Sequence, residues 1–469
     1  MPTAQLYLLE MACWGLMGGI LIMMALLVGR RWFRQRYFRR LDIWRQELEA
    51  SWGRWLRADL PDVCWRTERH RRVLLAERAA SVIEQPGGFC EASRHCTFLP
   101  AEVALACGDR GQPCAAPAYV RRRVEEWGLV RQQMEAVRAA EGLERAREII
   151  LLGRLRSPLC LPLLRELRDD PDPDVRLAAV RALGLLGTPE AVAPLLELLE
   201  RAEMTVSIPS WQRALISCCQ NHPALLLPAL DRLSGTPRTL LMRVVAEVAS
   251  PAILPNLLEL AEDPDPQIRA HVARALGRLE GEEVRGCLQR LLHDRIWFVR
   301  VRAARALGVH GGWKAADLLL DALNDTGPDV RHAAGESLAA APLPLDELFE
   351  KARHRLTPIG WGVLLGELGR RGLFWTLAEQ LVSPAPAVRA LAEQWLRAAL
   401  ENGARKTLLD ALFHPEGPVA DAMAELLVQH GDASLLPWLE ELRARAAEEP
   451  GGLHRLQRLE QRLTVSASP

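Results

Sequence analysis

The chain has 469 residues, of which 49% are hydrophobic and 25% charged, so its composition excludes a disordered polymer. Lysine and arginine total 59 and balance 59 acidic residues, which gives a formal net charge of zero. This balance does not indicate a protein that binds nucleic acid through its overall charge, although a neutral chain still carries local fields.

The first predicted element, in chain order, is a transmembrane anchor over residues 1–29. Residues 11–28 contain no charged side chain and would span roughly 27 Å as a helix, close to the hydrocarbon thickness of a bilayer. No lysine or arginine precedes this segment, whereas a basic and aromatic block follows it. This order favours an uncleaved anchor over a secretory signal peptide.

The basic block after the anchor sets the expected topology. Because positive charge is retained in the cytoplasm, we expect the N-terminus outside an inner (plasma) membrane and the bulk of the chain in the cytoplasm. Residues 6–28 would contact the bilayer core. The arginines expected at its anionic lipid surface are Arg30, Arg31, Arg34, Arg36, Arg39 and Arg40.

Residues 30–117 form the second predicted region, a juxtamembrane segment that is part helical and part irregular. Leu48, Trp52 and Leu56 fall at intervals of four on one face of an amphipathic helix, which we expect to pack on residues later in the chain. A further helix is predicted over residues 65–83, ended by a proline and two glycines.

The irregular stretch after that helix is rich in cysteine. Cys90, Cys96, Cys107 and Cys114 have no CxxC pair among them, whereas a structural zinc site usually has two close pairs. The spacing favours reduced cysteines in a cytosolic loop, and we predict no metal and no cofactor for the protein. Whether these four cysteines bind metal stays open.

An internal repeat of 31 residues is the strongest pattern in the chain. Ile268–Gly277 and Val299–Gly308 align directly, and Val175–Gly184 lies three periods before the first of them. Leucines keep the same step without a break: Leu164, Leu195, Leu226, Leu257, Leu288 and Leu319. We count about ten units over residues 118–463, followed by a disordered tail at 464–469.

Each unit has the pattern of a helical hairpin. Its first helix is apolar on one side, a turn containing Asp and Pro ends that helix, and the Asp can cap the second helix. The second helix carries small residues such as Ala182 and Gly184, which permit close approach of a neighbouring helix. A single hairpin cannot bury its apolar faces, so the units are expected to stack into one continuous core.

The repeat resembles the HEAT repeat, in the short bacterial form also seen in phycobilisome lyases. The resemblance implies an all-α, right-handed α-solenoid of about ten HEAT-like helical hairpins, preceded by one transmembrane helix. It also implies a ladder of Asp and Arg side chains between stacked units, at positions six residues apart such as Asp263 and Arg269. Trp361 replaces the Arg of a later unit, and His414 replaces an Asp, so the ladder should end near residue 331.

Two sets of side chains are candidate partner-binding residues. Arg181, Arg274 and Arg305 take the same place in their units, and Glu336 and Glu425 take it later in the array. These charges are either solvated helix charges or a surface, basic at one end and acidic at the other, that orients a charged partner.

The second set is aromatic. Trp297 and Phe298 stand where sister units have polar turn residues, and Trp313 stands where they have Pro189 or Glu282. Such exposed aromatics are typical of a contact patch, but they would also arise if the rings packed on each other to stabilise the turns.

No catalytic motif is present: the sequence has no GxSxG, P-loop, GxGxxG or HExxH pattern. The sequence therefore predicts a non-catalytic, membrane-anchored scaffold whose concave face binds a membrane-associated protein partner and no nucleic acid. An assembly that makes or exports an envelope glycan or exopolysaccharide is one setting for it. The alternative is an enzyme-like HEAT protein, either a chromophore lyase or a DNA glycosylase.

Overall fold

The computed structural model describes residues 42–48, 69–84, 116–201, 205–401, 403–448 and 451–466, together with positions 36, 39, 52 and 56. Every regular element in these ranges is a helix. The predicted anchor, most of the basic block and the four cysteines at 90, 96, 107 and 114 lie outside the described residues. Within them, no helix is long and apolar enough to cross a bilayer.

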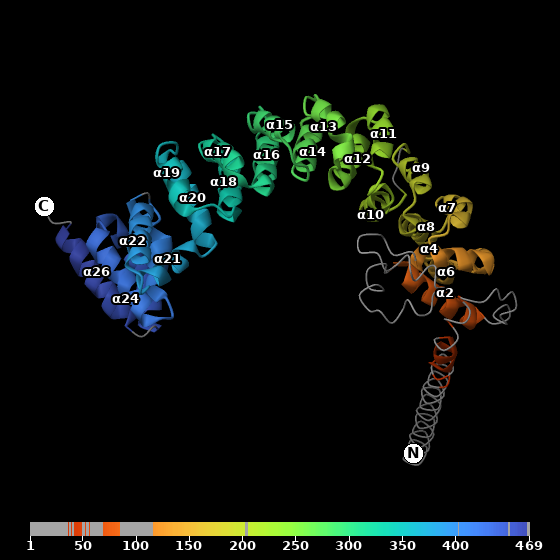
Figure 1. Ribbon diagram of the computed structural model, residues 1–469, viewed down its shortest axis with the longest axis horizontal. Coiled ribbons are helices and arrows are strands. Elements are labelled where there is room, and N and C mark those ends of the chain that lie inside the picture. The colour runs from red at the N-terminus through yellow and green to blue at the C-terminus, as the bar shows by residue number, and fades with distance from the viewer. Residues whose placement is uncertain are drawn as a thin grey trace, which may run out of the picture. The chain divides into compact units, whose positions relative to one another are not determined.

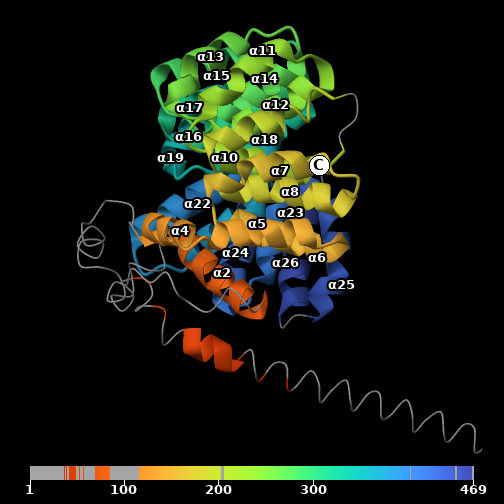
Figure 2. The same cartoon turned by 90° about the vertical axis from the view of Figure 1, so that its right-hand side faces the viewer.

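The chain divides into two compact units, Met1–Leu225 and Leu226–Pro469. The α-helices whose bounds are described in the first unit are α2 (Arg69–Glu84), α4 (Ala116–Glu126), α5 (Leu129–Ala139), α6 (Gly142–Arg154), α7 (Leu161–Leu167), α8 (Pro173–Leu186), α9 (Val192–Leu196) and α10 (Ile208–Cys219), labelled in Figure 1 and Figure 2. The 3₁₀ helices within the described residues are η3 (Pro158–Cys160), η4 (Pro189–Ala191), η5 (Pro223–Leu226), η6 (Pro251–Ile253), η7 (Ala411–Phe413) and η8 (Ala433–Leu435).

The second unit continues the alternation of a first and a second helix. Its α-helices are α11 (Leu227–Arg232), α12 (Gly235–Val248), α13 (Leu254–Leu260), α14 (Pro266–Leu276), α15 (Glu282–Leu292), α16 (Trp297–His310), α17 (Gly312–Ala322), α18 (Pro328–Ala340), α19 (Leu345–Arg353), α20 (Pro358–Arg370), α21 (Leu373–Leu381), α22 (Pro386–Glu401), α23 (Arg405–Asp410), α24 (Gly417–His430), α25 (Leu436–Glu448) and α26 (Gly452–Ser466). The all-α HEAT-like solenoid expected from the repeat is thus confirmed.

Second helices of neighbouring repeats pack directly on one another. In the second unit α12 contacts α14, α14 contacts α16, α16 contacts α18 and α18 contacts α20. In the view of Figure 1, α13, α15 and α17 follow the upper edge of this unit, and α14, α16 and α18 follow the lower edge. Side chains at one repeat position of the second helices therefore form a row along a single face.

Small residues set the distance between these helices. A Cβ atom added at Gly184 would lie 2.5 Å from the Cα of Ala214, and one at Gly308 would lie 2.6 Å from the Cβ of Ser337. Neither contact leaves room for a side chain, because the neighbouring atoms belong to the backbone or to a short side chain. The glycine of the repeat therefore marks the line where successive second helices meet.

The leucines that keep the 31-residue step form the core of the stack. None of the six exposes more than 2% of its surface: Leu164, Leu195, Leu226, Leu257, Leu288 and Leu319. Full burial of a leucine stabilises the folded state by about 1.5–3 kcal/mol, so this one position contributes substantially in every repeat.

The turns between helices are built as the sequence predicts. In the repeat that contains α14, the Asp265 carboxylate accepts a hydrogen bond from the Gln267 N–H at 2.8 Å and caps the helix, with Pro266 at its first position. The Asp263 carboxylate accepts from the Asp265 N–H at 2.9 Å and closes the turn. Proline at the first helical position removes no needed donor, because that N–H has no intrahelical partner.

A ladder of arginine–aspartate pairs joins successive turns. Arg269 Nε and Nη2 donate to the Asp294 carboxylate at 2.6 and 2.9 Å, and Arg300 donates in the same way to Asp325 at 2.8 and 2.9 Å. In both arginines Nη1 also donates to the backbone carbonyl six residues earlier. The predicted ladder is confirmed, but each arginine pairs with the aspartate of the next repeat, 25 residues further on.

Two further pairs extend the ladder beyond the residues named from the sequence. Arg238 lies 2.7 Å from Asp263, and in the first unit Arg145 lies 2.9 Å from Asp170. Both arginines keep the 31-residue step with the other ladder arginines, so the period alone could have identified them.

The ladder ends at Arg331, as predicted. Its Nη1 donates to the Asp325 carbonyl at 2.7 Å and the Thr326 carbonyl at 3.0 Å, but it forms no ion pair within the described part of the chain. The position 25 residues further on is Leu356, which offers no carboxylate.

Helix α2, which lies within the predicted juxtamembrane segment, is part of the first unit. Helix α2 packs against α4 and α6 (Figure 2). Arg154 of α6 donates to the Glu84 carboxylate at 2.8 and 2.9 Å, and this hydrogen bond raises the pKa of Arg154. Trp52 is buried and meets Trp127 edge to face at 6.3 Å, so the expected apolar face does pack on residues later in the chain.

Candidate binding face

One repeat position of the second helices carries a row of charged side chains, which we call the charge row. Its members in the second unit follow one another at steps of 31 residues on α12, α14, α16, α18 and α20: Arg243, Arg274, Arg305, Glu336 and Glu367. The row is basic on its first three helices and acidic on its last two. The sign changes between Arg305 and Glu336.

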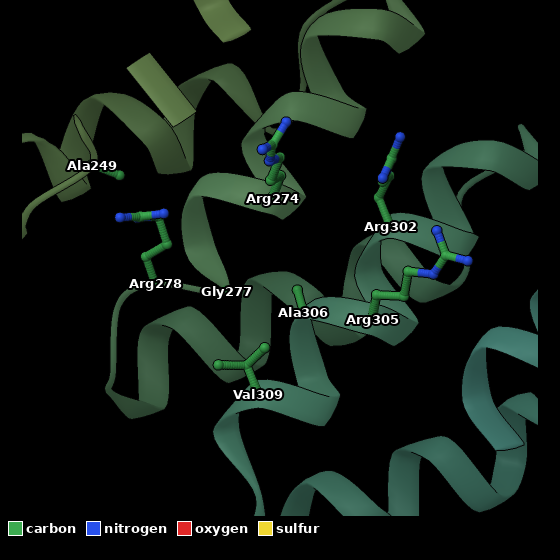
Figure 3. A pocket seen from close by; sticks show the side chains of 8 residues that line it. All are labelled: Ala249, Arg274, Gly277, Arg278, Arg302, Arg305, Ala306 and Val309. Atoms are coloured by element: carbon green, nitrogen blue, oxygen red, sulfur yellow. The ribbon is translucent and has the colours of Figure 1, made fainter. Parts of the chain in front are cut away.

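A groove lies beside the basic part of the row. Its volume is about 570 Å³, and we call it the arginine groove. Figure 3 shows the guanidinium groups of Arg274, Arg302 and Arg305 projecting to the same side of their helices. The complete lining is Ala249, Arg274, Gly277, Arg278, Arg302, Arg305, Ala306 and Val309.

The floor of the arginine groove is apolar and follows from the glycine of the repeat. A Cβ atom at Gly277 would lie 3.1 Å from the Cβ of Ala306, so α14 and α16 approach closely there. Val309, one turn further along α16, leaves 73% of its surface exposed. A group bound here could make apolar contacts with this aliphatic side chain and ionic contacts with the arginines around it.

The positive charge of the groove is only partly neutralised. Arg274 and Arg278 share the Glu247 carboxylate, with Arg278 Nη1 3.2 Å from its Oε2. Arg305 lies 3.8 Å from Glu336, but both side chains are more than half exposed, and such pairs contribute about 1 kcal/mol or less. Arg302 forms no ion pair among the residues that the structure describes.

Burial and the neighbouring arginines together lower the pKa values of two groups in this region. Burial, followed by the charges of Arg305 and Arg274, lowers the pKa of Arg302 below its ordinary value. Burial, followed by the charges of Arg243, Arg274 and Arg302, lowers the pKa of His271 to about 4. His271 is therefore neutral at pH 7, and the field that lowers its pKa is positive.

An adjoining groove shares Arg302 and Arg305 and contains the aromatic pair. We call it the aromatic groove; its volume is about 640 Å³. Trp297, the first residue of α16, is 52% exposed and meets Phe298 edge to face, with ring centroids 5.9 Å apart. The aromatic groove is lined by Trp297, Phe298, Val301, Arg302, Arg305, Asp329, His332, Ala333, Glu336, Glu367 and Arg370.

The far side of the aromatic groove is the acidic end of the charge row. Glu367 exposes only 8% of its surface. Its carboxylate lies 3.2 Å from His332 Nδ1 and also pairs with Arg370 on the same helix. Glu336 of α18 is exposed and lies between Glu367 and Arg305 in the row.

The structure brings four of the six predicted partner-binding residues together. Trp297, Phe298 and Arg305 line the aromatic groove, and Arg305 and Arg274 line the arginine groove. Arg181 is exposed on α8 in the first unit.

Trp313 does not line either groove. It is the second residue of α17, a first helix of its repeat, and Lys351 Nζ lies 5.2 Å from its ring centroid. Lys351 in turn lies 2.9 Å from Asp317. This cation–π contact gives Trp313 a partner within the fold.

Sequence reasoning missed Arg243, Arg302 and Glu367. Arg243 precedes Arg274 by one period and Glu367 follows Glu336 by one, so extending the 31-residue count would have found both. Arg302 has no such signal, because the equivalent positions of the flanking repeats hold His271 and Ala333. Its place in both grooves follows only from the packing of α16 between α14 and α18.

Among the described residues, no other group of side chains is suited to bind a metal ion or to act as a nucleophile. Within that part of the chain, no group of three or more His, Cys, Asp or Glu side chains could hold a metal ion. Burial raises the pKa of the Cys218 and Cys219 thiols to about 12, which keeps both protonated and unreactive at pH 7.

Comparison with protein families matches HEAT repeats over residues 134–206, 223–295 and 254–339. No curated protein matches the sequence. Among solved structures, the chain is similar to an engineered protein at 19% identity, covering 72% of this chain and 95% of that one with a TM-score of 0.30.

Two crystal structures of Kap121p are also similar. The one bound to Nup53p is 14% identical over 85% of this chain and 50% of that chain, with a TM-score of 0.36. The karyopherin bound to the extreme C-terminus of the phosphatase Cdc14p is 16% identical over 83% and 53%, also with a TM-score of 0.36. The chain therefore spans about half the length of Kap121p.

Proposed function

Because this chain is a HEAT repeat protein over residues 134–206 and 223–339, we propose that it is a non-catalytic scaffold that binds another protein. The binding surface of this proposal is the face of the second unit that carries the charge row and the two grooves. HEAT solenoids offer long regular faces suited to such partners.

One observation carries the proposal. Trp297 exposes 52% of its surface at the edge of a groove that also contains Phe298 and charged side chains of both signs. Exposed aromatic residues and arginines are the side chains that most often dominate binding energy at protein interfaces. Their meeting on one face supports a protein partner more directly than it supports a small substrate.

We further propose that the scaffold is held at a membrane. The support is the uncharged segment at residues 11–28 and the arginines that follow it. In this proposal the chain crosses an inner membrane once, with its N-terminus outside and its right-handed repeat stack in the cytoplasm. Anchoring would raise the effective concentration of a membrane-associated partner, as in an assembly that builds or exports an envelope glycan.

The proposal is tested by proteins that co-purify with the full-length chain in mild detergent. Trp297→Ala should remove the partner from the purified complex and leave the melting temperature near that of the wild type, because the ring is half exposed. Trp313→Ala is the matched control, since it removes a tryptophan of the neighbouring hairpin that lines neither groove. If both variants retain the same partner as the wild type, this face is not the binding surface.

A further inference from the structure

We infer that the arginine groove and the acidic end of the charge row together bind one extended segment of the partner, with acidic side chains at one end and basic side chains at the other. The acidic side chains would lie on Arg274, Arg302 and Arg305, and the basic ones beside the exposed carboxylates of Asp329 and Glu336 on α18. This inference rests on the proposed scaffold function and names the chemistry of its partner.

The excess positive charge of the arginine groove favours the binding of an anionic group. Four arginines line it, and the structure gives the groove a single shared carboxylate, Glu247, and a loose exposed pair with Glu336. A carboxylate placed between guanidinium groups forms short, charge-assisted hydrogen bonds and relieves their mutual repulsion. Arg302 is exposed, lines both grooves and has no ion-pair partner in the described residues, so its guanidinium group is available to a ligand.

The other half of the face decides what kind of anion fits. A nucleic acid or an anionic lipid surface presents negative charge everywhere, so the exposed carboxylates of Asp329 and Glu336 on α18 would repel it one helix away. A peptide can change sign along its length. The apolar floor at Ala306 and the exposed Val309 also favour a chain that carries aliphatic side chains between its charges.

The spacing of the row sets the spacing of the charges in the ligand. Packed helices lie about 8–10 Å apart, and an extended chain advances about 3.3 Å per residue. One repeat of the solenoid therefore corresponds to about three residues of an extended ligand. We expect acidic side chains at about every third position of the ligand, followed at the same interval by basic ones.

The experiment measures fluorescence anisotropy of labelled peptides with the full-length chain in mild detergent. The bipolar probe has two glutamates and then two lysines, each separated by two Ser or Leu residues. A shuffled probe has the same composition with alternating charges, and an acidic probe has serine in place of the lysines. We expect the bipolar probe to bind at least about tenfold more tightly than the shuffled one, and the acidic probe to fall between them.

Charge reversal locates the site. Arg302→Glu should weaken the bipolar probe at least about tenfold, and it should bind a probe whose glutamates are changed to lysine better than the wild type does. That gain shows that the variant is folded. Arg290→Glu is the matched control, because it changes the net charge by the same amount at a residue outside both grooves. The Arg290 side chain is 61% exposed on α15. This variant should alter the affinity less than about twofold.

Several outcomes would overturn the inference. Equal binding of the bipolar and shuffled probes, or an equal loss in Arg290→Glu, would mean that the attraction is only general. Displacement of the probe by millimolar inorganic phosphate would indicate a simple anion site, and displacement by an oligodeoxythymidine would indicate a polyanion site. If Trp297→Ala loses the natural partner while Arg302→Glu retains it and no probe binds, the scaffold function holds and this partner chemistry does not.

Discussion

Two stretches of the second unit connect successive repeats through different contacts, one through ion pairs and the other through stacked aromatic rings. From α13 to α18, arginine–aspartate pairs connect one turn to the next, and the side chains of Arg269 and Asp294 are 8% and 9% exposed. Burial alone would raise the pKa of Asp294, but hydrogen bonds from Arg269 and the Ile296 N–H outweigh it and hold the pKa below its usual value. The Asp294 carboxylate is therefore fully charged at pH 7.

From α19 to α22, stacked aromatic rings connect successive helices instead. Phe349 of α19 stacks on Trp361 of α20 at 5.6 Å and on Trp395 of α22 at 5.0 Å, with interplanar angles of 9° and 18°. Trp361 replaces the ladder arginine of its repeat and exposes only 6% of its surface, so an apolar contact takes the place of an ion pair there. Three rings from three helices thus replace the turn-to-turn ion pairs.

His414 shows how the turn survives without the ladder. It lies 25 residues after Arg389, at the position of a ladder aspartate. Its Nδ1 accepts a hydrogen bond from the Glu416 N–H at 3.1 Å, as Asp294 accepts from the Ile296 N–H at 2.8 Å. Its Nε2 lies 3.4 Å from Glu379, so the imidazole keeps the turn contact and makes no pair with Arg389.

The ladder and the binding face belong to the same repeats. Directional, bidentate hydrogen bonds hold α14, α16 and α18 at a defined rotation, and these helices carry the two grooves. A constellation of side chains from several helices needs such support to keep its geometry. Aromatic stacking gives comparable burial with less angular definition, and the charge row does not extend unbroken into those repeats.

The largest expected effect is in the aromatic stretch. Trp361→Ala removes a ring that is 6% exposed and leaves a cavity beside Phe349, so the free energy of unfolding of the second unit should fall by about 3–5 kcal/mol. Urea unfolding followed by far-UV circular dichroism measures it. Trp375, whose ring is less buried, provides the comparison, and an equal loss in Trp375→Ala would argue against a special role for the stack.

Removing one ladder arginine should come next. Arg269→Ala leaves the Asp294 carboxylate buried without its partner and should lower the free energy of unfolding by about 3 kcal/mol. Arg331→Ala is the matched control, because Arg331 keeps the same backbone contacts but has no carboxylate to pair with in the described chain; it should lower the free energy by about 1 kcal/mol. Equal losses in the same urea titrations would mean that the ion pairs add nothing beyond the turn contacts.

Acid should weaken the ladder before the aromatic stack. The pKa values of Asp294 and Asp325 are lowered in the folded chain, so their contribution is complete above the unfolded-state value of about 4 and is lost as the pH falls through the lower folded value. Hydrogen exchange, corrected for intrinsic rates, should show protection lost first in α14–α18 below about pH 4. Simultaneous loss in α20–α22 would contradict this order.

The smallest effect tests whether the ladder can be extended. His414→Asp places a carboxylate 25 residues after Arg389, whose Nη1 already donates to the Ser383 carbonyl at 2.7 Å as the ladder arginines do. A new pair should raise the free energy of unfolding by about 1 kcal/mol. The gain should vanish when Arg389→Ala is added; a gain that persists in the double variant would have another source.

Much of the fold could be predicted from the sequence because the same hairpin-forming pattern of residues recurs many times along the chain. Three features can be recognised within a single hairpin: the leucine that recurs every 31 residues, the turn with Asp and Pro, and the small residues such as Gly184. Each further repeat that contains them strengthens the prediction of a helical hairpin. The end of the ladder at Arg331 followed from the same count. Trp297 and Phe298 were identified as candidates because they break the pattern of their sister units.

The tertiary structure alone decided which of these side chains meet. Sequence position treated Trp297 and Trp313 alike, but one begins a second helix beside the grooves and the other begins a first helix beneath Lys351. The arginine groove exists because Gly277 lets α14 and α16 approach, which brings Arg302 and Arg305 beside Arg274. A repeat fixes what each helix carries, whereas the packing distance between helices determines which charges act together.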